Sequence, residues 1–157
     1  MKKFELTNEF ITNMFGTKLF RIRALVEFGD VEAGELGGYV EKESNLGHDD
    51  NAWVYDNAWV YGDAQVSGDA RVCGNARVYG DARVCGNGDY AYAHGFGSVN
   101  RTTTFFRLKD GGVGVRCGCF YGTLAQFRDK IRETHGETKK AQEYLMLADL
   151  MKLRFEK

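Results

Sequence analysis

Residues able to bind a flat, negatively charged molecule recur in the middle of this 157-residue chain at a spacing of 18. Three columns pair an aromatic residue with a residue 18 positions later: Trp53 with Arg71, Trp59 with Arg77, and Tyr61 with Tyr79. Arginine guanidinium groups bind carboxylates and phosphates through paired hydrogen bonds, and they also stack on aromatic faces. If residues 18 apart lie above one another, the columns predict a site for an anionic, planar ligand such as a nucleotide.

Further basic residues extend this candidate site. Arg83 follows Gln65 at the same spacing, and the strip from Arg101 to Lys109 combines hydroxyls, aromatic rings and bases. The strip is typical either of an amphipathic edge strand or of part of an anion site. The columns are typical of a surface ladder, of a subunit interface or of a ligand site. The predicted ligand-binding residues are Trp53, Trp59, Tyr61, Arg71, Arg77, Tyr79, Arg83, Arg107 and Lys109.

Other reactive side chains lack the spacing that catalysis or metal binding requires. Cys117 and Cys119 would share one face of a strand, but a zinc site needs two further ligands, and no CxxC or HxxxH motif supplies them. His48, His94 and His135 stand in no fixed relation to a serine, cysteine or carboxylate. His135 is followed by glycine, as at the end of a helix. We therefore predict no catalytic residue, no metal and no cofactor.

Six consecutive hexapeptides fill residues 51–86 and position the columns: NAWVYD, NAWVYG, DAQVSG, DARVCG, NARVYG and DARVCG. Alanine and valine lie two apart in every unit, so both point to one side of an extended segment. Asn or Asp opens each unit and glycine closes five of the six, which is typical of sharp corners. Three hexads would form one triangular coil with valine columns inside. The repeat therefore predicts a short left-handed parallel β-helix.

The chain before the repeats is expected to cap one open end of the solenoid. Val40 and Leu46 lie at intervals of six before Ala52, which predicts an irregular coil before the two regular ones. Residues 11–14 and 18–25 are predicted to form a hairpin around a Phe-Gly-Thr turn.

The chain after the repeats is expected to form a small ββαα module at the other end. Residues 87–100 have the composition of a loop, and 102–108 and 113–119 are predicted to pair as a hairpin. Thr123 is suited to N-cap a first helix, and a second helix is predicted over 138–153. The fold class is therefore mainly β, with a hairpin cap at 1–32, the β-helix at 33–87, and a loop with the ββαα module at 88–157.

Composition favours a soluble, globular protein of the cytoplasm. Apolar residues make up 43% of the chain, and no apolar run reaches the roughly 20 residues that cross a bilayer. No signal peptide is expected from the N-terminal residues, so the four cysteines are expected to stay reduced, and no membrane partner is expected. The net charge of −1 makes nucleic acid an unlikely partner. Residues 101–157 nevertheless hold 12 basic and 7 acidic side chains, so anion binding should involve this part.

The repeats resemble the bacterial hexapeptide-repeat superfamily, which is best known for trimeric acyltransferases. That resemblance implies acyl-coenzyme A bound between subunits and a histidine base, but only His48 and His94 flank the coils, and none lies within them. Over nearly the whole chain, segments such as FGDVEAGELGGYVEKESNL and TTFFRLKDGGVGVRCGCFYGT resemble small proteins of Firmicute genomes and prophages, often labelled as hypothetical proteins or as transferases. This second resemblance implies an accessory phage role, such as capture of a nucleotide signal of host defence.

Three functions remain open from the sequence. A homotrimeric, non-catalytic protein that captures an anionic small molecule fits the aromatic and arginine columns. A hexapeptide acyltransferase fits the repeats, and a structural module that binds a host protein fits the phage resemblance. We take the first as the working hypothesis, with self-association through a solenoid face.

Overall fold

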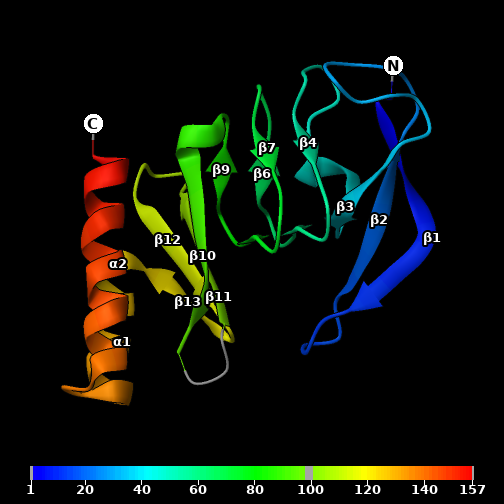
Figure 1. Ribbon diagram of the computed structural model, residues 1–157. Helices are drawn as coiled ribbons and strands as arrows, with labels where there is room; N and C mark the ends of the chain where they lie inside the picture. Colours follow the sequence, from blue (N-terminus) through cyan, green and yellow to red (C-terminus); the bar gives the residue numbers. More distant parts are fainter. Residues whose placement is uncertain (1, 98–100, 157) are drawn as a thin grey trace.

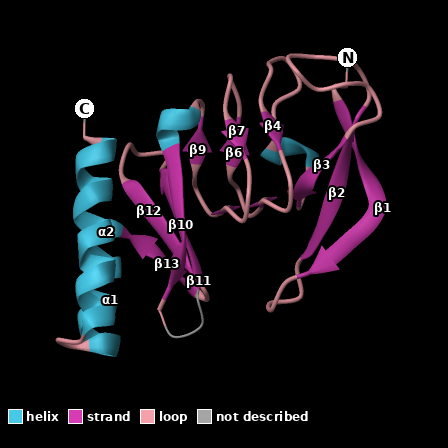
Figure 2. Ribbon diagram, in the orientation of Figure 1, coloured by secondary structure: helices cyan, strands magenta, loops and turns pink. Residues whose placement is uncertain are grey.

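The computed structural model describes residues 2–97 and 101–156 and shows a β-solenoid between two caps (Figure 1). The N-terminal hairpin lies at one end of the solenoid. A four-stranded sheet with two helices lies at the other end, as the colours of Figure 2 make clear. The prediction of a mainly β chain with two C-terminal helices is confirmed.

The strands are long in the caps and short in the solenoid. The N-terminal part contains β1 (Phe4–Thr12), β2 (Lys18–Ala24) and β3 (Leu36–Val40). Each hexad contributes one two-residue strand: β4 (Trp53–Val54), β5 (Trp59–Val60), β6 (Gln65–Val66), β7 (Arg71–Val72), β8 (Arg77–Val78) and β9 (Arg83–Val84). The C-terminal part contains β10 (Tyr90–Phe96), β11 (Arg101–Arg107), β12 (Val113–Cys117), β13 (Phe120–Thr123), α1 (Leu124–His135) and α2 (Lys139–Phe155).

Parallel pairing in the solenoid follows the predicted spacing of 18. Three ladders stack the valines of successive coils: Val54 on Val72 (β4 and β7), Val60 on Val78 (β5 and β8), and Val66 on Val84 (β6 and β9). All repeat valines and alanines are buried in one apolar core. Burying one valine side chain stabilises a fold by about 1.5–3 kcal/mol. The short strands therefore depend more on this core than on their few hydrogen bonds.

An irregular coil precedes the regular ones, as the upstream period predicted. Val40 pairs in parallel with Val60, and Leu46 bridges to Val66. These partners lie 20 positions apart instead of 18. The two extra residues fall between Leu46 and Val54, so Leu46 continues the valine column and not the alanine column.

Asn45 closes the corner between Val40 and Leu46. Its amide nitrogen donates to the carbonyls of Gly62 and Ala64, at 3.2 and 2.8 Å. Its Oδ1 accepts from the backbone N–H groups of Glu41 and Lys42, at 3.1 and 2.9 Å. The side chain is fully buried, so it satisfies four backbone groups in the corner.

Asn45→Ala should destabilise the solenoid by about 3 kcal/mol, because buried backbone groups would lose their partners. The free energy of unfolding in urea measures this loss. Asn75→Ala is the matched control, because Asn75 opens a hexad from an exposed position and should change stability by less than about 0.5 kcal/mol. Equal stability of the two variants would contradict the role given to Asn45.

The N-terminal hairpin continues the solenoid sheet. β1 pairs antiparallel with β2, β2 pairs antiparallel with β3, and β3 pairs in parallel with β5. β1 begins at Phe4, well before the predicted 11–14, because the buried Phe4 packs into the solenoid core. The hairpin thereby covers the edge that the first coil would expose.

The C-terminal cap differs from the predicted ββαα module, because its antiparallel sheet has four strands in the order β10-β11-β12-β13. Residues 90–96 form β10 instead of a loop, and β13 adds a further strand. Phe106 packs into the solenoid core, whereas the adjacent Phe105 packs against the helices. Because side chains alternate along β11, this one sheet contacts both the solenoid core and the core beneath the helices.

The two helices cover the face of this sheet that lies away from the solenoid (Figure 1). Thr123 N-caps α1 in a capping box with Gln126, and Gly136 ends the helix, as predicted. Thr138 N-caps α2, which extends to Phe155, two residues past the predicted end. None of the helices in the described part of the chain is long and apolar enough to cross a membrane.

Candidate functional site

A cleft of about 320 Å³ lies where the solenoid meets both caps. Its walls are the tip of the N-terminal hairpin, the solenoid face of β5 and β8, and the strands β10 to β12 with the turn that follows. Its lining residues are Met14, Trp59, Tyr61, Arg77, His94, Arg101, Thr102, Arg116 and Gly118. No one of these parts forms the cleft alone, so both caps must be folded for it to exist.

The solenoid contributes a cation–π pair and a pair of tyrosines in contact. The Arg77 guanidinium lies 3.9 Å from the centroid of the Trp59 ring, because the parallel register places these residues on successive coils. Nη1 of Arg77 donates to the carbonyl of Asn75 at 2.8 Å. The rings of Tyr61 and Tyr79 pack with centroids 4.5 Å apart and planes tilted by 35°. These contacts hold one guanidinium at the cleft and give it an aromatic floor.

Arg116 reaches the same cleft from β12. Val115 packs against the helices, so alternation along the strand turns Arg116 toward the solenoid. Arg116 is 8% exposed, and its guanidinium lies 4.9 Å from the ring centroid of Tyr79 and 5.8 Å from that of Tyr61. The ring of Phe15, at the tip of the N-terminal hairpin, lies 5.7 Å from it on the open side. Arg116 is therefore held among rings and not by an acid.

Two neighbouring strands complete the wall. Nδ1 of His94 on β10 lies 2.7 Å from Oγ1 of Thr102 on β11. Arg101 starts β11, and its Nη1 lies so close to Gly118 that a Cβ atom there would be 1.7 Å away. Gly118 also has a φ of +60°, in the left-handed region. Glycine at position 118 therefore allows the left-handed turn and leaves room for the Arg101 guanidinium.

Three guanidinium groups around this cleft have no carboxylate partner among the described residues. Within residues 2–97 and 101–156, no ion pair involves Arg77, Arg101 or Arg116. Burial lowers the pKa of Arg77, as expected when a cation loses water and no nearby acid compensates. Like charges that meet in a half-closed space destabilise one another, and an anion placed between them would relieve that cost.

The repeats have a counterpart among known families. Residues 52–68, 64–76 and 70–86 match a family model described as the YdcK beta solenoid repeat. The repeat region is therefore similar to β-solenoid proteins. The matched segments lie within 52–86 and include neither cap, so they cover only the solenoid wall of the cleft. A comparison with curated protein sequences gave no match.

Four of the predicted ligand residues lie at the cleft or in contact with it. Trp59, Tyr61 and Arg77 line the cleft, and Tyr79 packs against both Tyr61 and Arg116. The predicted stacking of Trp59 with Arg77 and of Tyr61 with Tyr79 is confirmed. The 18-residue spacing predicted these contacts, because they depend only on the local geometry of the repeat.

Trp53 requires a correction, because it is fully buried instead of lying on an outer face. The rings of Phe4 and Phe28 pack edge-on against it, with centroids 6.3 and 5.3 Å away. Arg71 pairs with Trp53 in register, but its side chain forms an ion pair with Asp30 at 2.9 Å. Because of the N-terminal segment, Trp53 belongs to the core and Arg71 forms a structural ion pair, so this predicted column does not lie on an open face.

The other predicted basic residues lie away from the cleft. Arg83 is on β9, on a different solenoid ladder, and donates to backbone oxygens of its own and the preceding coil. Arg107 pairs with Asp89 at 3.4 Å. Lys109 is exposed and lies beside Asp81 at the end of the solenoid. The structure does not bring these three residues together with Arg77.

The sequence prediction missed Arg116, although its signal was present. In Val113-Gly-Val-Arg-Cys117 the apolar side chains alternate, so an arginine on the opposite face of the strand must meet whatever covers that face. Arg101 and Thr102 fall within the strip already considered for anion binding. Of the flanking histidines, His94 reaches the cleft, whereas His48 stacks on Phe4 at 4.4 Å in the N-terminal cap.

Proposed function

We propose that this protein is a non-catalytic binding protein that captures a small, multiply charged anion, such as a nucleotide, in the cleft between the solenoid and its caps. The observation that supports this proposal is the convergence of Arg77, Arg101 and Arg116, without acidic partners among the described residues, on one cleft. Guanidinium groups bind phosphate and carboxylate oxygens through short charge-assisted hydrogen bonds. Partial burial strengthens such bonds, because the local dielectric constant is lower than in water.

A ligand-dependent shift in melting temperature tests this proposal. Pyrophosphate and nucleoside phosphates should raise the Tm above that in chloride at equal ionic strength, because they bind only the folded cleft. At a free ligand concentration of 100 times Kd the stabilisation is about 2.7 kcal/mol. Uncharged nucleosides should have a smaller effect. Equal Tm values in all these solutions would count against an anion-binding cleft.

Acyl transfer is a second candidate function, because His94 is exposed in the same cleft. Its Nδ1 is engaged with Thr102, and the resemblance to acyltransferases implies a histidine as general base. Turnover of acetyl-coenzyme A that is lost in His94→Ala would support this alternative. Failure of coenzyme A to bind would eliminate it.

The left-handed winding and the homotrimer also remain proposals. Hexads of alanine, valine and glycine favour the winding, and the ladder carrying Gln65 and Arg83 is a face available for self-association. Burial of Trp53 weakens the case for a trimer, since one expected surface aromatic is internal. Sedimentation equilibrium should give three times the 17.7-kDa chain mass, and a single-chain mass would contradict the trimer. A single-chain mass would not contradict the proposed anion cleft, because one chain supplies all its lining residues.

A further inference from the structure

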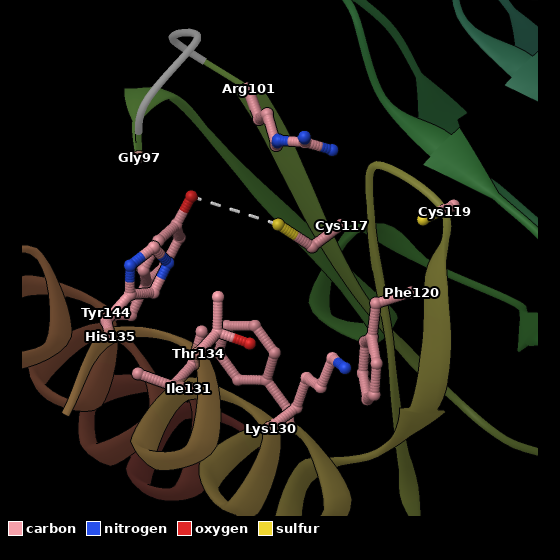
Figure 3. Close-up of a pocket in the computed structure, with 11 residues that line it drawn as sticks. Gly97, Arg101, Cys117, Cys119, Phe120, Lys130, Ile131, Thr134, His135 and Tyr144 are labelled. Atoms are coloured by element: carbon pink, nitrogen blue, oxygen red, sulfur yellow. Dashed lines mark hydrogen bonds between the residues drawn. The ribbon is translucent and has the colours of Figure 1, made fainter.

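A second pocket, which Figure 3 shows, adjoins the anion cleft at Arg101. It measures about 340 Å³ and lies between the C-terminal sheet and the two helices. Arg101 lines both spaces. Gly118 of the cleft lies in the chain between Cys117 and Cys119, which line the second pocket. The two spaces therefore share one wall.

Flat apolar and aromatic side chains form much of this second pocket. The rings of Phe120 and Phe127 lie 5.9 Å apart, and His135 stacks on Tyr144 at 5.9 Å with an interplanar angle of 25°. Figure 3 shows the His135 and Tyr144 pair on one side and Phe120 on the other, with Ile131 of α1 between them. Walls of this kind suit a planar ring.

A few polar groups accompany these rings. The Tyr144 hydroxyl lies 3.9 Å from the Cys117 sulfur, which is a weak contact. Burial raises the pKa of Tyr144 to about 12, so the hydroxyl keeps its proton at neutral pH. Lys130 and Thr134 add an ammonium and a second hydroxyl from α1. Donors around an apolar floor match the nitrogen and oxygen atoms at the edge of a heterocycle.

The anion cleft itself offers little free aromatic surface. Arg77 already lies over the Trp59 ring, and Tyr61 packs against the same indole at 6.0 Å in an edge-on arrangement. The cleft therefore presents cations, whereas the second pocket presents flat walls. The two spaces are complementary in chemistry and meet at Arg101.

We infer that the ligand has two parts: a multiply charged phosphoryl group bound by Arg77 and Arg116 in the cleft, and a heteroaromatic ring bound in the second pocket, with Arg101 between them. A nucleoside diphosphate has this chemistry. The inference rests on the proposed function and deepens it, because it assigns the ring to a separate compartment formed by the C-terminal cap.

Isothermal titration calorimetry with pyrophosphate and adenosine diphosphate as probes tests this assignment. Thr134→Trp fills the second pocket from an exposed position on α1. Ala125→Trp is the matched control, since it adds the same indole at an exposed position of α1 that lines neither space. Wild type and Ala125→Trp should bind the nucleotide about tenfold or more tightly than pyrophosphate, the gain that base stacking provides. Thr134→Trp should bind pyrophosphate like wild type and lose that gain.

The two proposals fail in different ways. If wild type binds pyrophosphate but gains nothing from the adenosine, or if Thr134→Trp keeps the full nucleotide affinity, the second compartment is refuted and the anion cleft stands. If wild type binds neither probe, the proposed function fails and this inference fails with it. Gly118→Ala should weaken the binding of both probes, because its Cβ would displace the Arg101 guanidinium. If a folded Gly118→Ala variant binds both probes as tightly as wild type, Arg101 is not part of the wall that the two spaces share.

Discussion

Arg116→Met should lose most of the affinity for small anions while the chain stays folded. Hydrogen bonds to charged groups contribute about 1.5–3 kcal/mol each, so Kd for pyrophosphate should rise by roughly ten- to a hundredfold. Methionine keeps apolar contact with Tyr61 and Tyr79 but removes both the charge and the N–H donors. Calorimetric titration measures the change, and the affinity that remains should be less sensitive to salt.

Two control variants give this prediction its specificity. Arg116→Lys keeps the charge but not the paired donors, and should fall between wild type and Arg116→Met. Arg83→Met changes an arginine at the same hexad position as Arg77 but on another ladder, and should bind pyrophosphate like wild type. Equal losses in Arg83→Met and Arg116→Met would indicate a diffuse charge effect instead of a site.

The stability of the ligand-free variant separates a binding role from a packing role. If Arg116 faces other cations without acidic partners, its replacement by methionine should leave the free energy of unfolding unchanged or slightly higher. If Arg116 serves only as a cation over Tyr79, the replacement should lower stability and leave anion binding intact. A binding role thus predicts weaker anion binding with unchanged or slightly higher stability, whereas a packing role predicts unchanged anion binding with lower stability.

Trp53→Ala should destabilise the protein by about 3–5 kcal/mol, as large-to-small changes of buried aromatic residues do. Trp53 is fully buried and holds the N-terminal segment on the first regular coil through Phe4 and Phe28. Close packing extends to Gly37, where a Cβ atom would lie 2.8 Å from the indole. Unfolding in urea, followed by circular dichroism, measures the loss.

Trp59→Ala is the natural comparison, because Trp59 occupies the same hexad position one unit later. It is only partly buried, so its replacement should cost less than about 2 kcal/mol. The same change should weaken pyrophosphate binding, since Arg77 would lose the ring on which it lies. Equal destabilisation by the two changes would contradict the assignment of Trp53 to the core and Trp59 to the cleft.

The parts of the fold that follow from local chemistry could be predicted from the sequence. Alanine and valine two apart, with glycine at the corner, determine the coils and their register whatever the ends of the chain do. The helix ends at Thr123 and Gly136 follow equally from local capping groups. The Arg77 and Trp59 pair is the part of the site that depends on this local register.

The remainder depends on partners distant in sequence. Trp53 and Trp59 have identical neighbours along the chain, and only the return of the N-terminal segment buries one and not the other. β10 lacks the β-branched residues that predict strands, and it is stabilised by pairing with β11. Arg116 joins Arg77 only because the C-terminal sheet caps the last coil.

A crystal structure of the protein grown with pyrophosphate tests the central claim most directly. The account predicts electron density for the anion within hydrogen-bonding distance of the guanidinium groups of Arg77, Arg101 and Arg116, with Trp59 and Tyr61 beside it. An empty cleft in the presence of saturating pyrophosphate, or an anion bound only elsewhere on the surface, would contradict it.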